Sequence, residues 1–138
     1  MAVNKLLVAF DESEGADRAL AMAASLAAVN PEAHVDVVYV VPIPLLDETQ
    51  MANFKDILDM MISDGEDLLA EAEQKMGEDV AARTDSLLLT GTNVKLIGQR
   101  DYDLLIVGNR GLSGLKEYMG SVSHKLLHAS PIPVLIAK

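Results

Sequence analysis

Five short apolar runs, rich in Val, Leu and Ile, punctuate the chain. They cover residues 5–10, 35–41, 86–90, 103–107 and 134–137. Several of them are nearly continuous apolar runs, whereas a strand with one solvated face would alternate apolar and polar residues. Continuous runs are typical of strands that are buried on both faces of a parallel sheet. The pattern therefore predicts five strands in one parallel sheet.

Segments with helical periodicity separate these runs. Ser13 is placed to cap a helix over residues 14–29, which Asn30 and Pro31 end. Over residues 49–76 apolar side chains recur at helical spacing with acids between them, and Gly77 follows. Two shorter helices are expected over residues 92–99 and 121–129, and residues 42–50 form the longest expected loop.

Strands and helices thus alternate along the whole chain. This order predicts an α/β fold in which right-handed crossovers place helices on both faces of a five-stranded parallel sheet, as a three-layer sandwich. With 138 residues the chain has the length of one domain, spanning residues 1–138. No internal repeat or interdomain linker divides it.

Charge and composition narrow the classes of partner. The formal net charge is −10, made up of −12 over residues 1–99 and +2 over residues 100–138. Most of the surface would repel a nucleic acid, and a small anion is expected to bind in the last third of the chain.

The absence of Cys excludes disulfides and thiolate metal sites. With no signal-like N-terminus and no apolar run of about 20 residues, we expect a cytoplasmic protein without a membrane partner.

Candidate binding residues follow the expected strands, because ligands bind at the carboxyl ends of strands in open parallel sheets. Gly108 and Gly111 let backbone N–H groups approach an anion closely, and Arg110 adds positive charge. Residues 120–123 (Gly-Ser-Val-Ser) open the last helix with unpaired N–H donors and two hydroxyls. Together these are the parts of a phosphate cradle, and the alternative is that the glycines only form turns.

Asp11 directly follows the first strand at the same edge. Its carboxylate can accept hydrogen bonds from two hydroxyls or hold a metal-bound water, and the alternative is that it only favours the start of the next helix.

These motifs resemble the universal stress protein (UspA) family. The resemblance rests on Asp-Glu-Ser-Glu at residues 11–14, on Gly108 and Gly111 followed by Gly-Ser-Val-Ser at residues 120–123, and on the closing Pro-Ile-Pro-Val-Leu-Ile at residues 131–136. It covers essentially the whole chain. The family implies an adenine nucleotide α-hydrolase-like, Rossmann-like fold and a homodimer paired through the last strand, Val134–Ala137.

In the ATP-binding branch of the family, the resemblance implies that Asp11 meets ribose and that the backbone of Val40 meets adenine. Glycines, hydroxyls and Arg110 would surround the phosphates of ATP, together with Mg²⁺. The complete set of expected cofactor-binding residues is Ala9, Phe10, Asp11, Val40, Val107, Gly108, Arg110, Gly111, Gly120, Ser121, Val122 and Ser123. One departure is the spacing between Gly111 and Gly120, which is one residue shorter than in the ATP-binding pattern and could move the two phosphate-binding halves out of register.

Other chemistries fit the sequence less well. No general base for rapid hydrolysis is evident, so we expect a nucleotide-binding sensor and no catalytic residue, with at most slow turnover or autophosphorylation at Ser121 or Ser123. His124 and His128 share one helix face but lack a third ligand, and His34 is expected at the surface. The seven Met residues are expected to fill the core. The main alternative is a UspA-like dimer that binds no nucleotide and acts as a protein-interaction module.

Overall fold

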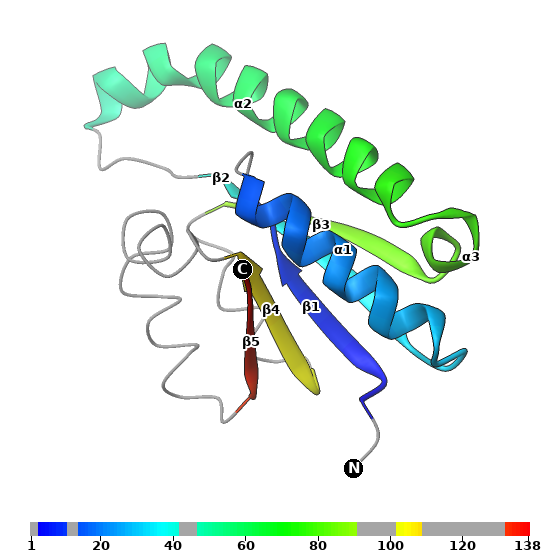
Figure 1. Cartoon of the computed structure of the whole chain (residues 1–138). Helices are drawn as coiled ribbons and strands as arrows, with labels where there is room; N and C mark the ends of the chain where they lie inside the picture. Colours follow the sequence, from blue (N-terminus) through cyan, green and yellow to red (C-terminus); the bar gives the residue numbers. More distant parts are fainter. Residues whose placement is uncertain (1–2, 11–13, 42–46, 91–101, 109–131) are drawn as a thin grey trace.

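The computed structural model describes residues 3–10, 14–41, 47–90, 102–108 and 132–138. Within them the chain forms five strands and three helices (Figure 1). In chain order these are β1 (Lys5–Ala9), α1 (Glu14–Ala28), β2 (His34–Val41), α2 (Glu48–Lys75), α3 (Glu78–Ala81), β3 (Thr84–Thr90), β4 (Leu104–Gly108) and β5 (Val134–Ala137).

The strands form one sheet in the order β3-β2-β1-β4-β5, and every neighbouring pair is parallel. The predicted five-stranded parallel α/β fold is therefore confirmed. The expected strand bounds agree with the structure to within two residues, the largest difference being the earlier start of β3 at Thr84. The helices expected over residues 92–99 and 121–129 lie outside the described residues.

The start of α2 corrects the expected loop over residues 42–50. Asp47 caps the helix, because its carboxylate accepts a hydrogen bond from the backbone N–H of Gln50 at 2.7 Å. In return, the side chain of Gln50 accepts one from the backbone N–H of Asp47 at 3.1 Å. This capping box satisfies two backbone donors at once and starts the helix at Glu48, inside the segment expected to be a loop.

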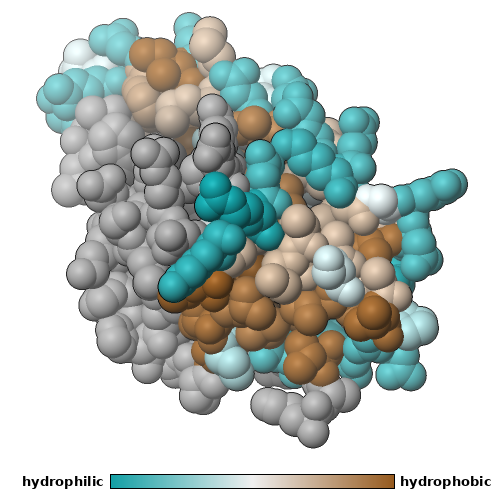
Figure 2. Space-filling model, in the orientation of Figure 1, coloured by the Kyte–Doolittle hydropathy of each residue, from teal (hydrophilic) through white to brown (hydrophobic). Residues whose placement is uncertain are grey.

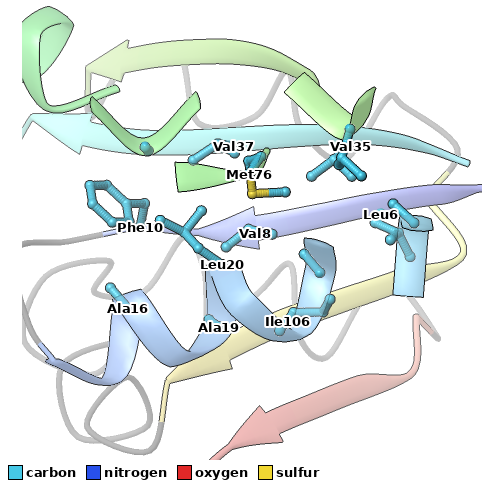
Figure 3. Close-up of a cluster of buried hydrophobic side chains, with 14 of the residues drawn as sticks. Leu6, Val8, Phe10, Ala16, Ala19, Leu20, Val35, Val37, Met76 and Ile106 are labelled. Atoms are coloured by element: carbon cyan, nitrogen blue, oxygen red, sulfur yellow. The ribbon is translucent and has the colours of Figure 1, made fainter. Parts of the chain in front are cut away.

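The main core lies between the sheet and the two long helices, which cover the same face (Figures 1 and 3). Leu6, Val8 and Val37 of the central strands are almost completely buried there. The sheet side of α1 is built mostly of alanines, so this helix packs close to the strands. A smaller buried cluster on the other face consists of Leu7, Val38 and Leu89.

Only the second half of α2 belongs to this core. Its buried residues, Gly65, Leu69 and Ala72, all lie there. In the first half Met51 and Met60 are exposed. The expectation that the methionines fill the core is therefore correct for Met76 and wrong for these two, and it is also wrong for Met22 of α1, which is 38% exposed. Figure 2 shows the apolar surface at the projecting first half of α2. None of the described helices is long and apolar enough to cross a membrane.

Arg83, just before β3, ties the end of α1 to the sheet. Its guanidinium donates to the backbone carbonyls of Asn30 at 2.9 Å, Ala33 at 2.7 Å and Ala27 at 3.1 Å. Carbonyls at the end of a helix lack partners within the helix, and the negative end of the helix dipole attracts a cation. One side chain thus caps α1 and holds the turn that leads into β2.

Candidate functional site

The candidate site is the side of the sheet at which the carboxyl ends of the parallel strands lie, and we call it the carboxyl edge. From β1 the chain crosses to β2 on one side, while β4 pairs with the other side of β1. The direction of strand succession therefore reverses between β1 and β4. In open α/β sheets such a reversal opens a crevice at the carboxyl ends of the strands, which is the usual ligand position.

The described part of the chain places five of the sequence-predicted residues at this edge. Ala9 ends β1 and Phe10 follows it, Val40 is the second-last residue of β2, and Val107 and Gly108 end β4. Seven further predicted residues lie outside the described residues: Asp11, Arg110, Gly111, Gly120, Ser121, Val122 and Ser123. Their roles in binding remain predictions.

Phe10 and Val107 prove to be parts of the scaffold. The ring of Phe10 is buried in the main core (Figure 3), and its backbone N–H donates to the carbonyl of Val38 at 2.9 Å. Val107 is also almost completely buried. Their side chains are in the interior and the N–H of Phe10 is already paired, so a contact of these two residues with a ligand would use other backbone atoms, and their role in binding stays a prediction.

Gly108 is needed for packing, which sequence reasoning did not anticipate. An ideal Cβ at this position would lie 2.3 Å from the carbonyl carbon and 2.4 Å from the carbonyl oxygen of Gly15. Both partners of this contact are glycines, so the first turn of α1 lies directly against the end of β4. The missing side chain thus makes room for α1, and the expected approach of an anion to the backbone of Gly108 stays a prediction.

This close approach determines the electrostatics of the edge. The amino-terminal end of α1, which carries the positive end of the helix dipole, lies beside the carboxyl end of β4. Such a position favours an anionic group, such as a phosphate, over a cation.

At the opposite edge of the sheet, where the strands begin, Asp103 has a structural role that its place in the sequence does not reveal. Its carboxylate accepts hydrogen bonds from the backbone N–H groups of Asn4 and Lys5, both at 2.9 Å. These bonds, from Asn4 first and then Lys5, hold the pKa of the Asp103 carboxyl below its usual value because they stabilise the charged form. Asp103 was expected as the first residue of a strand, and its register against Asn4 depends on the folded sheet.

His34 also lies at this opposite edge. It is half-exposed, as expected, but its ring contacts the carboxylates of Asp36 and Asp85. The clue in the sequence is the His-x-Asp spacing at the start of a strand, which places both side chains on one face. Asp85 comes from a separate strand, so only the strand pairing could reveal it.

Comparison with known proteins agrees with this architecture. The chain is 30% identical over 148 residues to the universal stress protein YxiE of Bacillus subtilis, covering 98% of this chain and 99% of the relative. The structure of UspA from Lactobacillus plantarum superposes with a TM-score of 0.76 at 18% identity, covering 100% of this chain and 99% of the other. The universal stress protein from Archaeoglobus fulgidus, solved in complex with dAMP, superposes with a TM-score of 0.54 at 22% identity, covering 100% of both chains.

A match to the family described as the universal stress protein family extends over residues 2–138. The match spans nearly the entire chain and includes the five strands and the segments that carry the predicted phosphate-binding motifs. The chain belongs to the universal stress protein family.

Proposed function

We propose that this universal stress protein binds an adenine nucleotide at the carboxyl edge of the sheet and acts as a regulatory sensor in a stress response. The observation that carries the proposal is the reversal between β1 and β4, with the amino terminus of α1 beside it. A family member of the same fold has been solved with dAMP, which supports an adenine nucleotide as the ligand.

The proposed ligand is ATP with Mg²⁺. Asp11 would accept hydrogen bonds from the ribose hydroxyls, and the backbone of Val40 would meet adenine. Arg110, Gly111 and the helix start at residues 120–123 would hold the phosphates. Among the described residues, the edge fits the anionic part of this ligand through the end of α1. Gly108 would contribute by allowing that helix to come close.

We assign no catalytic step to the protein. Its proposed output is the difference between a nucleotide-bound and a nucleotide-free surface, read in the cytoplasm by partner proteins. The proposed assembly is a homodimer that pairs through β5, the edge strand next to β4. The apolar side chains of Val134 and Ile136 on this strand are each 38% exposed. Pairing would give hydrogen-bond partners to the backbone N–H and C=O groups along the open side of β5 and would cover these side chains.

A second candidate function is a protein-interaction module that binds no nucleotide. It is favoured by the exposed apolar residues in the first half of α2, namely Met51, Ile57 and Met60. The short spacing between Gly111 and Gly120 favours it as well. The two candidates differ in one measurable property, which is whether an adenine nucleotide stabilises the fold.

Thermal unfolding with and without Mg-ATP, with Mg-GTP as the matched control, tests the proposal. At about 100 times the dissociation constant, a ligand adds about 2.7 kcal/mol to the free energy of unfolding. For a domain of this size that raises the melting temperature by roughly 5–10 °C. A rise with ATP alone supports the adenine-nucleotide sensor. No rise with either nucleotide supports the interaction module.

A further inference from the structure

We infer that His34, Asp36 and Asp85 form a binding site for one divalent transition-metal cation of the zinc type. The site lies at the edge of the sheet where β2 and β3 begin, opposite to the proposed nucleotide edge. The inference rests on side-chain geometry and charge at that edge and is independent of nucleotide binding.

The strand register brings the three side chains together. His34 and Asp36 are the first and third residues of β2, so they share one face of the sheet. Asp85 lies opposite Asp36 in the β2–β3 pairing. The Nε2 atom of His34 is 3.2 Å from Oδ1 of Asp36 and 3.0 Å from Oδ2 of Asp85. All three ligand atoms lie within 4.8 Å of one another.

The two separations from Nε2 of His34 match the edges of a metal coordination polyhedron. Bonds from zinc to imidazole nitrogen and carboxylate oxygen are about 2.0–2.2 Å long, so neighbouring ligands around the ion lie about 3.0–3.5 Å apart. An ion can therefore be held by these three atoms with small adjustments of the side chains. In the absence of an ion, the imidazole serves as a hydrogen-bond donor between the two carboxylates.

The balance of charge favours a cation of charge two. Two carboxylates directly opposite each other on adjacent strands repel. The repulsion matters most at Asp36, whose side chain is only 9% exposed. A divalent cation between the two carboxylates would neutralise both, whereas an imidazole carries at most one positive charge.

Groups around the cluster orient its ligands. The hydroxyl of Tyr102 donates to Oδ2 of Asp36 at 2.7 Å, which leaves Oδ1 directed at His34. The backbone N–H of His34 donates to the carbonyl of Asn4 at 2.7 Å and fixes the start of β2. A carboxylate ligand that is itself hydrogen-bonded is the usual arrangement around protein-bound metals.

The donor set indicates which ions would bind. One imidazole nitrogen with two carboxylate oxygens suits Zn²⁺ and Co²⁺, whereas Mg²⁺ and Ca²⁺ prefer sites made only of oxygen. The side chains of His34 and Asp85 are 46% and 71% exposed, so an ion can enter from solvent. Three protein ligands leave a coordination position for water.

Calorimetric titration of the 138-residue chain with ZnCl₂ tests the site, and Co²⁺ provides an optical readout of coordination. We expect a site that saturates at micromolar zinc and that millimolar Mg²⁺ does not displace. His34→Ala and Asp85→Asn should each weaken zinc binding at least tenfold. The side chain of His34 is half-exposed and that of Asp85 is largely exposed, so these variants should keep the fold, which circular dichroism checks. Tyr102→Phe, which removes only the orienting hydroxyl, should weaken binding about tenfold.

Two matched controls locate the site. Asp56→Asn changes an exposed acid in the first half of α2 and should leave zinc binding unchanged. The double variant His124→Ala with His128→Ala removes the other two histidines of the chain and should retain the His34-dependent site. The inference is overturned if the wild type does not bind zinc below millimolar concentration. It is also overturned if His34→Ala binds as tightly as the wild type.

Discussion

The backbones of Gly15 and Gly108 are in contact, although 93 positions separate the two residues in the sequence. A Cβ at position 108, which any other residue would carry, would lie 2.3 Å from the carbonyl carbon of Gly15. This contact brings the first turn of α1 against the last residue of β4. It therefore determines where the positive end of the α1 dipole meets the sheet. The packing of two glycines is thus the structural basis of the proposed anion-binding edge.

Gly108→Ala should lower the free energy of unfolding by about 1–3 kcal/mol, because the added methyl group meets backbone that cannot rotate away. Gly65→Ala is the matched control. Its new Cβ would meet the end of the Leu88 side chain at 2.6 Å and the ring of Tyr39 at 3.0 Å. These side chains can move, and alanine favours a helix over glycine by about 1 kcal/mol. Urea denaturation measures both, and an equal or larger loss in Gly65→Ala would contradict the packing argument.

Arg83→Ala should lower the free energy of unfolding by about 2–4 kcal/mol, since three backbone carbonyls lose a charged donor. Arg83→Lys should recover only part of this, because an ammonium group lacks the planar fork of donors. Asp79→Asn removes only the exposed carboxylate next to Arg83 and should change stability by less than about 0.5 kcal/mol. Urea denaturation separates the three variants. Equal stability of the lysine variant and the wild type would show that charge alone is sufficient.

Asp103→Asn should reduce stability at neutral pH and have much less effect in acid. The pKa of the Asp103 carboxyl is lower in the folded state than its usual value, so the folded protein binds this proton more weakly than the unfolded chain does. The carboxylate therefore stabilises the fold above about pH 4, and this contribution disappears as the pH falls through the lowered pKa. Unfolding midpoints in urea at pH 7 and pH 3 measure the effect. A difference between wild type and variant that is the same at both pH values would refute this role.

Ile136→Lys should convert the proposed dimer into a monomer, because it places a charge in the middle of the exposed β5 edge. Val29→Lys makes the same chemical change at a position that is 83% exposed and distant from β5 in the sequence. The control should retain the dimer. Light scattering at micromolar concentration gives the mass of each variant, and a monomeric wild type would rule out this assembly.

Gly111→Val should abolish ATP binding without unfolding the protein, because the added side chain would fill the proposed approach to the phosphates. Gly114→Val makes the same change in the segment between Gly111 and Gly120, outside the two-glycine motif, and should bind ATP more tightly than Gly111→Val does. Calorimetric titration with Mg-ATP measures both affinities. Unchanged affinity in Gly111→Val would exclude the proposed phosphate contact.

The fold was largely predictable from local patterns. Apolar runs of strand length revealed all five strands, because strands buried on both faces have no polar alternation to obscure them. Helical periodicity revealed both long helices. The four-residue helix α3 was missed because so short a segment has no periodicity to detect. The start of α2 was misjudged by one residue, since the reciprocal bonds of Asp47 and Gln50 depend on side-chain geometry.

The sequence by itself determined the order of the five described strands and the two long helices, the parallel sheet and the family, because these depend on residue types at short spacing. Only the tertiary structure decided which distant residues meet. Gly108 packs on Gly15, the carboxylate of Asp103 holds the start of β1, and Asp85 lies opposite Asp36. Each of these contacts follows from strand order and register. Register is set by how the whole sheet buries its apolar side chains, and no local stretch of sequence contains that information.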